Sequence, residues 1–366
     1  MSGTTWVYIM LGIYIIYCFY WGLKGYFTEK TSAGYAIAGR SIPFFAFLLA
    51  STAASFSGWT FVSHPGAIYL SGLAYAFASF YVLTIPITGA FFGKRTWLMG
   101  KRYGFVTPGE MYHQYFNSEA MRILTVLVAL FFSVPYLGIQ LRASGVLFNI
   151  LTDGLFSVNV GMWMLAIIVT LYVALGGLRS VAYVDTAQCI LLWGGIVALG
   201  LIGVNFAGGW DGMTSKYGDI VAWINSGGAE VPKWADPEAV KVFMEKGKGL
   251  IGITPLGVTN KVAVPGVIQF VPAGAMAKGG TWTGVMILTY MFALMGIHSS
   301  PAFSMWAFAN KNPRPFPLQQ VWASTAGIGF ALIIFTTLQS MSGWVLSFLP
   351  GGAGGGTVLP IERLIS

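Results

Sequence analysis

The chain has 366 residues, of which 56% are hydrophobic and 9% charged, and its formal net charge at pH 7 is +8. Soluble domains usually carry about 25% charged residues, so this composition excludes a water-covered surface and predicts an all-α integral membrane protein. The basic residues stand in short segments between apolar runs, which is typical of membrane topology and argues against nucleic-acid binding.

Eight apolar runs are long enough to cross a bilayer. The second run is unusually long and contains small polar residues, so we expect a broken helix there. The predicted spans are residues 6–23, 43–71, 74–93, 120–150, 158–175, 181–204, 282–307 and 319–348.

The basic residues of the short loops all fall on one side if the spans alternate, and cationic loops are typically cytoplasmic. This pattern predicts that the N-terminus lies outside and that loop 94–118 lies inside. We expect residues 1–366 to form a single membrane domain, with 205–280 as an extracellular loop that carries a short helix near 236–247. The residues that set this orientation are Lys24, Lys30, Arg40, Lys94, Arg95, Lys101, Arg102, Arg122, Arg179, Lys311 and Arg314.

The segment from Leu49 to Thr60 is rich in small and hydroxylated residues and lies at membrane depth. Such a composition lets a helix unwind, and its carbonyl and hydroxyl oxygens are suitable ligands for an alkali cation. The alternative is that these small residues only allow helices to pack closely. A second break is predicted further along, at Ser63-His64-Pro65-Gly66.

Gly176 and Gly177 form the predicted turn between the fifth and sixth spans. Asp185 follows in the next helix, with Gln188 on the same face. A carboxylate within the membrane is costly, which makes Asp185 a functional candidate. The alternative is a structural ion pair between Asp185 and Arg179.

The seventh span contains a further predicted break, where Gly296 and Pro301 bracket three polar residues. Of these, His298 is a candidate for binding a solute or a proton, and the alternative is a packed, hydrogen-bonded histidine. Gln140 is also polar at membrane depth, in the fourth span.

Common enzyme motifs are absent from the sequence, which has no P-loop, GxSxG, HExxH or CxxC pattern. Its three histidines are far apart in sequence, which gives a metal site little support. Cys18 and Cys189 fall within apolar spans and are expected to be packed thiols. We therefore expect neither an enzyme nor a bound cofactor.

Three stretches of the sequence resemble the sodium/solute symporter family, and most closely its sodium/proline branch. The resemblance implies two inverted five-helix repeats of the leucine-transporter type, preceded by one extra helix. The first repeat and two helices of the second would be present here. The stretches are Tyr35-Ala36-Ile37-Ala38-Gly39-Arg40-Ser41-Ile42-Pro43, Ser57-Gly58-Trp59-Thr60-Phe61 with Pro65-Gly66-Ala67-Ile68-Tyr69, and Gly176-Gly177-Leu178-Arg179-Ser180-Val181 with Asp185, Thr186 and Gln188.

The resemblance implies a sodium-coupled symporter of the cell membrane that takes up a small organic solute by alternating access. Sodium would be the coupling ion and the only metal, and its partners would be the solute and the lipid bilayer. The expected cation ligands are Ala53, Ser55, Phe56, Ser57 and Asp185. The expected solute contacts are Gly58, Thr60, Ser79, Gln140, His298 and Ser299.

Two features depart from the family pattern. The family's second repeat needs three more helices, so the chain is expected to be truncated at its C-terminus and not to catalyse coupled uptake alone. Proline-type members carry an aspartate where this chain has Ser55, which leaves the solute open. A sensor module of a signalling protein, built on the same fold, and a structural subunit without transport are the alternative functions.

Overall fold

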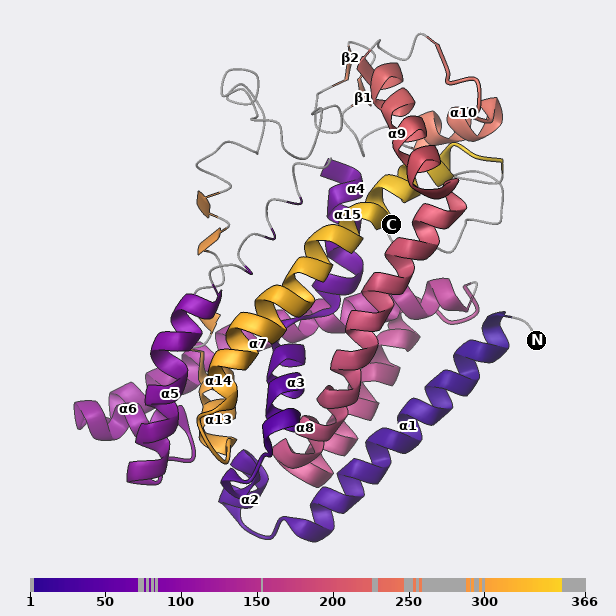
Figure 1. The fold of residues 1–366 in the computed structure, drawn as a ribbon. Coiled ribbons are helices and arrows are strands. Elements are labelled where there is room, and N and C mark those ends of the chain that lie inside the picture. Colours follow the sequence, from indigo (N-terminus) through magenta and orange to yellow (C-terminus); the bar gives the residue numbers. More distant parts are fainter. Residues whose placement is uncertain are drawn as a thin grey trace. The chain divides into compact units, whose positions relative to one another are not determined.

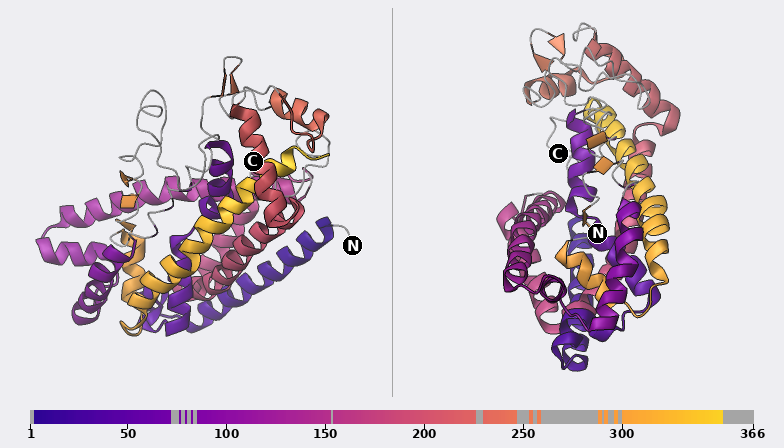
Figure 2. Two further views of the ribbon diagram at one scale, coloured as in Figure 1. Left: turned by 45° about the horizontal axis from the view of Figure 1, so that its top comes forward. Right: turned by 90° about the vertical axis from the view of Figure 1, so that its left-hand side faces the viewer.

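The computed structural model describes residues 3–71, 76, 79, 82, 85–152, 154–225, 230–246, 253–254, 257–258, 288–289, 291–292, 296–297 and 300–350. The described part is almost entirely helical (Figures 1 and 2). It falls into two compact units, which are described here one at a time. The first unit comprises Met1–Trp59, Val82–Trp193 and Leu294–Gly329, and the second comprises Thr60–Tyr81, Gly194–Ala293 and Phe330–Ser366.

The first unit is built on helices from three separate parts of the chain (Figure 1). Its largest buried cluster contains Phe47, Phe308 and Phe316, one from each of three different helices. The helices are α1 (Gly3–Thr28), α2 (Ser32–Ile37), the 3-10 turn η1 (Ala38–Arg40), α3 (Phe44–Ser55), α5 (Ile85–Tyr103), α6 (Pro108–Phe116), α7 (Glu119–Leu151), α8 (Val158–Phe206) as far as Trp193, α13 (Pro301–Ala309), α14 (Pro315–Pro317) and the π-helix η5 (Leu318–Gly329).

The connection from α2 to α3 turns through three successive residues with positive φ, namely Ala38 (48°), Gly39 (58°) and Arg40 (57°). This conformation is costly for residues other than glycine. Arg40 offsets part of the cost, because its guanidinium donates to the carbonyl oxygens of Phe105 at 2.7 Å and Phe308 at 3.3 Å. Partial burial lowers the pKa of Arg40. It remains a cation at neutral pH, because an arginine pKa normally lies above 12.

The turn predicted at Gly176 and Gly177 is confirmed as a kink within α8. Gly177 has φ 57° and ψ −156°, a backbone conformation available mainly to glycine. A Cβ atom at this position would also collide with the backbone oxygen of Tyr35. The predicted fifth and sixth spans are therefore two helices that join at Gly177.

The second unit is organised around two helices that run in parallel, α4 and α15. His64, Pro65 and Tyr69 of α4 are hydrogen-bonded to Thr336, Ser340 and Trp344 of α15 respectively, so the residue numbers rise together. The elements are the π-helix η2 (Trp59–Ser63, from Thr60 onward), α4 (His64–Ser71), the remainder of α8, α9 (Gly209–Asn225), α10 (Pro237–Lys246), an antiparallel pair of two-residue strands, β1 (Ile253–Thr254) and β2 (Gly257–Val258), and α15 (Phe330–Ser347).

The segment predicted as an extracellular loop contains two helices that pack on α15. The short helix expected near 236–247 is confirmed as α10. Helix α9 was not predicted, although its buried residues recur at helical spacing. Met213, Tyr217, Ile220 and Trp223 of α9 belong to one buried cluster with Trp344 and Phe348. The extracellular location of this segment stays a prediction.

Four helical segments are long and apolar enough to cross a membrane among the described residues, and a bent pair adds a fifth. The second break predicted at Ser63–Gly66 is wrong, because α4 runs without interruption from His64. Helix α4 follows η2 directly, so the helix passes from π to α geometry next to Pro65. The predicted spans 74–93 and 282–307 lie partly outside the described residues, so the number eight stays a prediction. The segments are Thr5–Thr28, Glu119–Leu151, Val158–Phe206 and Pro315–Ser347, and the pair is Phe44–Ser55 with Thr60–Tyr69.

Candidate functional site

The helix break predicted between Ala53 and Thr60 is confirmed. Helix α3 ends at Ser55, and Phe56 is extended, with φ −113° and ψ 145°. The N–H of Phe56 donates to the carbonyl oxygen of Ala53 at 3.0 Å, which closes the last turn of α3. Several backbone groups are thereby freed from regular helical pairing at membrane depth.

The last turns of α3 carry hydroxyl groups that donate hydrogen bonds within the helix and can still accept one. Ser51, Thr52 and Ser55 each donate to the carbonyl oxygen four residues earlier, at 2.6, 2.7 and 3.0 Å. A hydroxyl that donates can still accept or bind a cation. Thr52 accepts from the Nε2 of Gln319 at 3.3 Å, and Gln319 also donates to Ser324 at 3.0 Å. These five side chains form a buried polar cluster between α3 and η5.

Helix α7 packs against the break and forms hydrogen bonds with it. The backbone N–H of Gly58 donates to Oε1 of Gln140 at 2.6 Å, and the side chains of Ser57 and Tyr136 are hydrogen-bonded to each other. The Nε2 of Gln140 is buried and has no hydrogen-bond partner among the described residues. A Cβ atom on Gly58 would lie 2.8 Å from the Cβ of Ala143, so only glycine allows this close approach.

Asp185 lies in α8, and its carboxylate forms no hydrogen bond or ion pair within the described part of the chain. The suggested alternative, an ion pair with Arg179, is wrong. Arg179 pairs with Glu29, with Nε 2.5 Å from Oε1. The titratable side chains close enough to interact with the Asp185 charge are Tyr14, Cys18, Tyr172 and Cys189.

The surroundings of Asp185 connect α1, α3 and α8 within the first unit. Gln188 donates to the hydroxyl of Tyr14 at 2.6 Å, and the thiol of Cys189 is hydrogen-bonded to the backbone of Ala53. Cys18 and Cys189 are free and buried, as expected for packed thiols. Asp185 therefore lies one turn of α8 before a residue that contacts the end of α3.

The second unit contains Thr60 and Ser79, two of the predicted solute contacts. Both are buried. The hydroxyl of Thr336 donates to the carbonyl oxygen of Leu332 and lies 3.0 Å from the Nδ1 of His64. We therefore assign the proton of neutral His64 to Nδ1, which leaves Nε2 to accept from Ser79. The hydroxyl of Ser79 is thus already engaged in orienting an imidazole ring.

Sequence reasoning located part of this arrangement. The structure brings Ala53, Ser55, Phe56, Ser57, Gly58 and Gln140 together in the first unit. His298 and Ser299 lie outside the described residues. Gln319, Ser324, Thr336 and Ser340 were missed, although polar residues four apart in an apolar helix, such as Thr336 and Ser340, indicate a helix contact.

Comparison with known proteins identifies the family. The model of the sodium:solute symporter family matches residues 35–340. This chain belongs to the sodium:solute symporter family. The family consists of transporters. The membrane location predicted from composition is therefore confirmed.

Two relatives show how much of such a transporter the chain covers. The chain is 26% identical over 245 residues to the high-affinity proline transporter PutP of Bacillus subtilis, an alignment that covers 64% of this chain and 47% of PutP. It is 28% identical over 212 residues to the sodium/pantothenate symporter of Escherichia coli, covering 56% of this chain and 42% of that protein. The chain thus spans less than half the length of these two relatives.

A solved structure supports the fold. A Na+-coupled sialic acid symporter in a substrate-bound outward-open state matches with a TM-score of 0.50 at 14% identity. The match covers 100% of this chain and 80% of the symporter. The expected all-α, inverted-repeat symporter fold is confirmed.

Proposed function

We propose that this protein belongs to a sodium-coupled symporter that takes up a small organic solute by alternating access. Family membership supports the reaction, and the amide of Gln140 supports the location of the solute site. Its oxygen is fixed by Gly58, while its buried nitrogen lacks a partner among the described residues. An unsatisfied buried donor costs about 1–3 kcal/mol, so an acceptor oxygen of a bound solute is favoured there.

The same break offers oxygen ligands for the coupling ion. Ala53 and Phe56 supply backbone carbonyls, and Ser55 and Ser57 supply hydroxyls. Unwound carbonyls near the bilayer midplane are suitable ligands for Na+. Entry of one Na+ is driven by about 2.3 kcal/mol per 100 mV of membrane potential, which is enough to accumulate solute. Asp185, which has no cation paired to it among the described residues, would attract sodium along the path.

The chemistry of Gln140 limits the solute. Its Nε2 is a neutral donor, so the solute should present an acceptor oxygen, such as a carboxylate or hydroxyl. Proline, pantothenate and sialic acid, which the named relatives handle, all offer such an oxygen. Gly58, Thr60, Ser79, His298 and Ser299 remain proposed contacts. The sensor and structural-subunit alternatives gain no support from these comparisons.

The test is uptake by the whole protein in liposomes with an imposed sodium gradient, using proline, pantothenate and hydroxylated solutes as probes. We expect uptake that collapses without sodium. Gln140→Glu keeps the oxygen that accepts from Gly58 and removes the donor, so it should raise the KM for solute by roughly tenfold.

The matched control is Gln114→Glu on the exposed side of α6, which should leave the KM unchanged. Absence of sodium-dependent uptake for the whole panel would contradict the proposed function. Uptake with an unchanged KM in Gln140→Glu would contradict only the assignment of Gln140.

A further inference from the structure

The C-terminal half of α5 carries an unusual concentration of unpaired positive charge. Lys94, Arg95, Lys101 and Arg102 are all exposed, and α5 contains no acidic residue. None of the four forms an ion pair within the described part of the chain. Such a helix end favours an anionic partner.

The nearby carboxylates do not neutralise these cations. Glu110 accepts from the backbone N–H groups of Val106 at 2.7 Å and Thr107 at 3.3 Å in the capping box of α6. Glu119 lies 3.8 Å from Arg122. Both carboxylates interact with groups close to them in sequence. The positive charge of α5 is therefore not balanced by any acidic residue in the described part of the chain.

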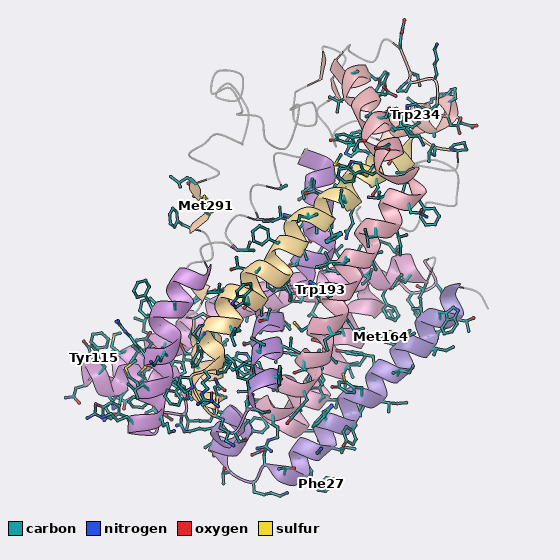
Figure 3. All side chains as sticks on the ribbon, viewed as in Figure 1. Phe27, Tyr115, Met164, Trp193, Trp234 and Met291 are labelled. Atoms are coloured by element: carbon teal, nitrogen blue, oxygen red, sulfur yellow. The ribbon has the colours of Figure 1, made fainter. Side chains whose placement is uncertain are left out.

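An apolar groove lies directly beside this charge, between α5 and α6. It has a volume of about 270 Å³, and Ser304 of α13 also lines it. Tyr115 and Phe116, at the end of α6, are 79% and 52% exposed, and Figure 3 labels Tyr115 there. The lining residues are Phe92, Thr96, Met99, Met111, Tyr112, Tyr115, Phe116 and Ser304.

Helical spacing places two of the four cations next to the groove and two away from it. Phe92, Thr96 and Met99 form the α5 wall at spacings of four and three residues. Arg95 and Arg102 lie three residues after Phe92 and Met99, so they flank this wall. Lys94 and Lys101, one residue earlier, face the opposite side of α5, and Lys101 lies over the ring of Trp97 at 5.0 Å.

A polar group inside the groove also lacks a partner. Thr96 is 9% exposed, and its hydroxyl makes no hydrogen bond within the described part of the chain. A hydroxyl in an apolar groove requires a partner to offset desolvation. The groove therefore combines apolar walls, the Thr96 hydroxyl without a partner in the described part of the chain, and two arginines at its edge.

A lipid matches this combination better than a protein does. The chain has 20 basic and 12 acidic residues, so a second copy offers few carboxylates for the arginines. An anionic phospholipid supplies an apolar chain, ester oxygens and a phosphate. Cytoplasmic leaflets also attract basic segments beside membrane helices, and the α5–α6 loop is predicted to be cytoplasmic.

We propose that the α5–α6 groove binds an anionic phospholipid. One acyl chain lies along Phe92 and Met99, the phosphate lies between Arg95 and Arg102, and Thr96 donates to an ester oxygen. The proposal concerns binding alone and does not depend on which solute is transported.

The test is native mass spectrometry of the whole protein in detergent, titrated with phosphatidylglycerol or phosphatidylcholine of identical acyl chains. Arg95→Gln/Arg102→Gln should weaken phosphatidylglycerol binding by roughly tenfold or more. Lys94→Gln/Lys101→Gln makes the same change in charge on the opposite face and should weaken it by less than about threefold. Met99→Trp fills the groove without changing charge and should remove the bound lipid.

Equal binding of the two lipids by the unmodified protein, or equal effects of the two double variants, would overturn the proposal. A stable dimer that Met99→Trp dissociates would show that a second copy occupies the groove instead. If the double arginine variant does not fold, Met99→Trp tests the proposal alone. Phosphatidylglycerol that still binds to Met99→Trp would also overturn the proposal.

Discussion

The guanidinium of Arg179 forms an ion pair with Glu29, with Nε 2.5 Å from Oε1. The same group donates to the hydroxyl of Ser41 at 2.6 Å and to the carbonyl oxygen of Ala38 at 3.4 Å. Arg179 therefore links α8 to the residue that follows α1 and to the turn that follows α2. Because it is engaged there, it does not pair with Asp185, whose carboxylate forms no ion pair within the described part of the chain.

Asp185→Asn should raise the sodium concentration needed for half-maximal uptake by about tenfold in the whole protein. Asparagine keeps the size and polarity of the side chain but removes its charge. A tenfold shift corresponds to about 1.4 kcal/mol of lost cation interaction. Solute affinity at saturating sodium should change much less. The measurement is uptake titrated against sodium and normalised to the protein in the membrane.

Asp211→Asn is the matched control, because Asp211 is exposed in the first turn of α9. It should leave the sodium curve unchanged. If Asp185→Asn lowers only the amount of folded protein and the sodium curve is unaltered, the cation-path assignment of Asp185 is wrong.

Glu29→Gln should destabilise the first unit, because it leaves the partly buried Arg179 without its counter-charge. The Glu29 side chain is 9% exposed and that of Arg179 is 31% exposed. Removing one partner of a fully buried pair costs about 3–5 kcal/mol, and solvent access to Arg179 reduces this to roughly 1–3 kcal/mol. Thermal unfolding in detergent measures the loss. Glu119→Gln, at a pair whose carboxylate is 66% exposed, should change stability by less than about 1 kcal/mol. Equal effects would contradict the prediction.

Composition and short-range pattern predicted the features that depend on neighbouring residues. The run of small residues before Gly58 predicted the helix break, and Gly176 with Gly177 predicted the kink of α8. Both signals are local, since glycine and small hydroxylated residues weaken helical pairing wherever they occur.

Partners that come from distant parts of the chain could not be predicted in this way. Arg179 and Asp185 are close in sequence, which suggested a pair, whereas the partner of Arg179 is Glu29, directly after α1. The hydrogen bond from Gln319 to Thr52 could not be predicted either. These residues are far apart in sequence, and only the fold brings η5 next to α3. Helix α9 was not predicted because polar residues separate its apolar ones. The segment 205–280 was interpreted as a loop from its mixed charge.

Thr336→Val should destabilise the second unit by about 1–3 kcal/mol. Valine has nearly the same shape but cannot accept from His64, so a buried imidazole N–H loses its partner. Thr337→Val is the control, because Thr337 is also buried but donates only to the carbonyl oxygen of Ile333 in its own helix. That change should cost less than about 1 kcal/mol. Chemical unfolding of both variants compares them, and a ranking in the opposite order would refute the assignment of the His64 proton to Nδ1.

Gly58→Ala should impair uptake strongly, and a second substitution should restore much of it. The added methyl group would lie 2.8 Å from the Cβ of Ala143 and 3.1 Å from Oε1 of Gln140, so α7 must move away from the break. Ala143→Gly removes the nearer obstacle. We expect uptake to fall by roughly tenfold or more in Gly58→Ala and to recover partly in the double variant, because residues in contact show coupled effects. Gly138→Ala, also in α7, meets nothing within 4 Å and should leave uptake near its original rate. Rates are measured at saturating sodium and normalised to the protein in the membrane. If Ala143→Gly worsens the defect, close packing of α7 against Gly58 is not what Gly58→Ala disturbs.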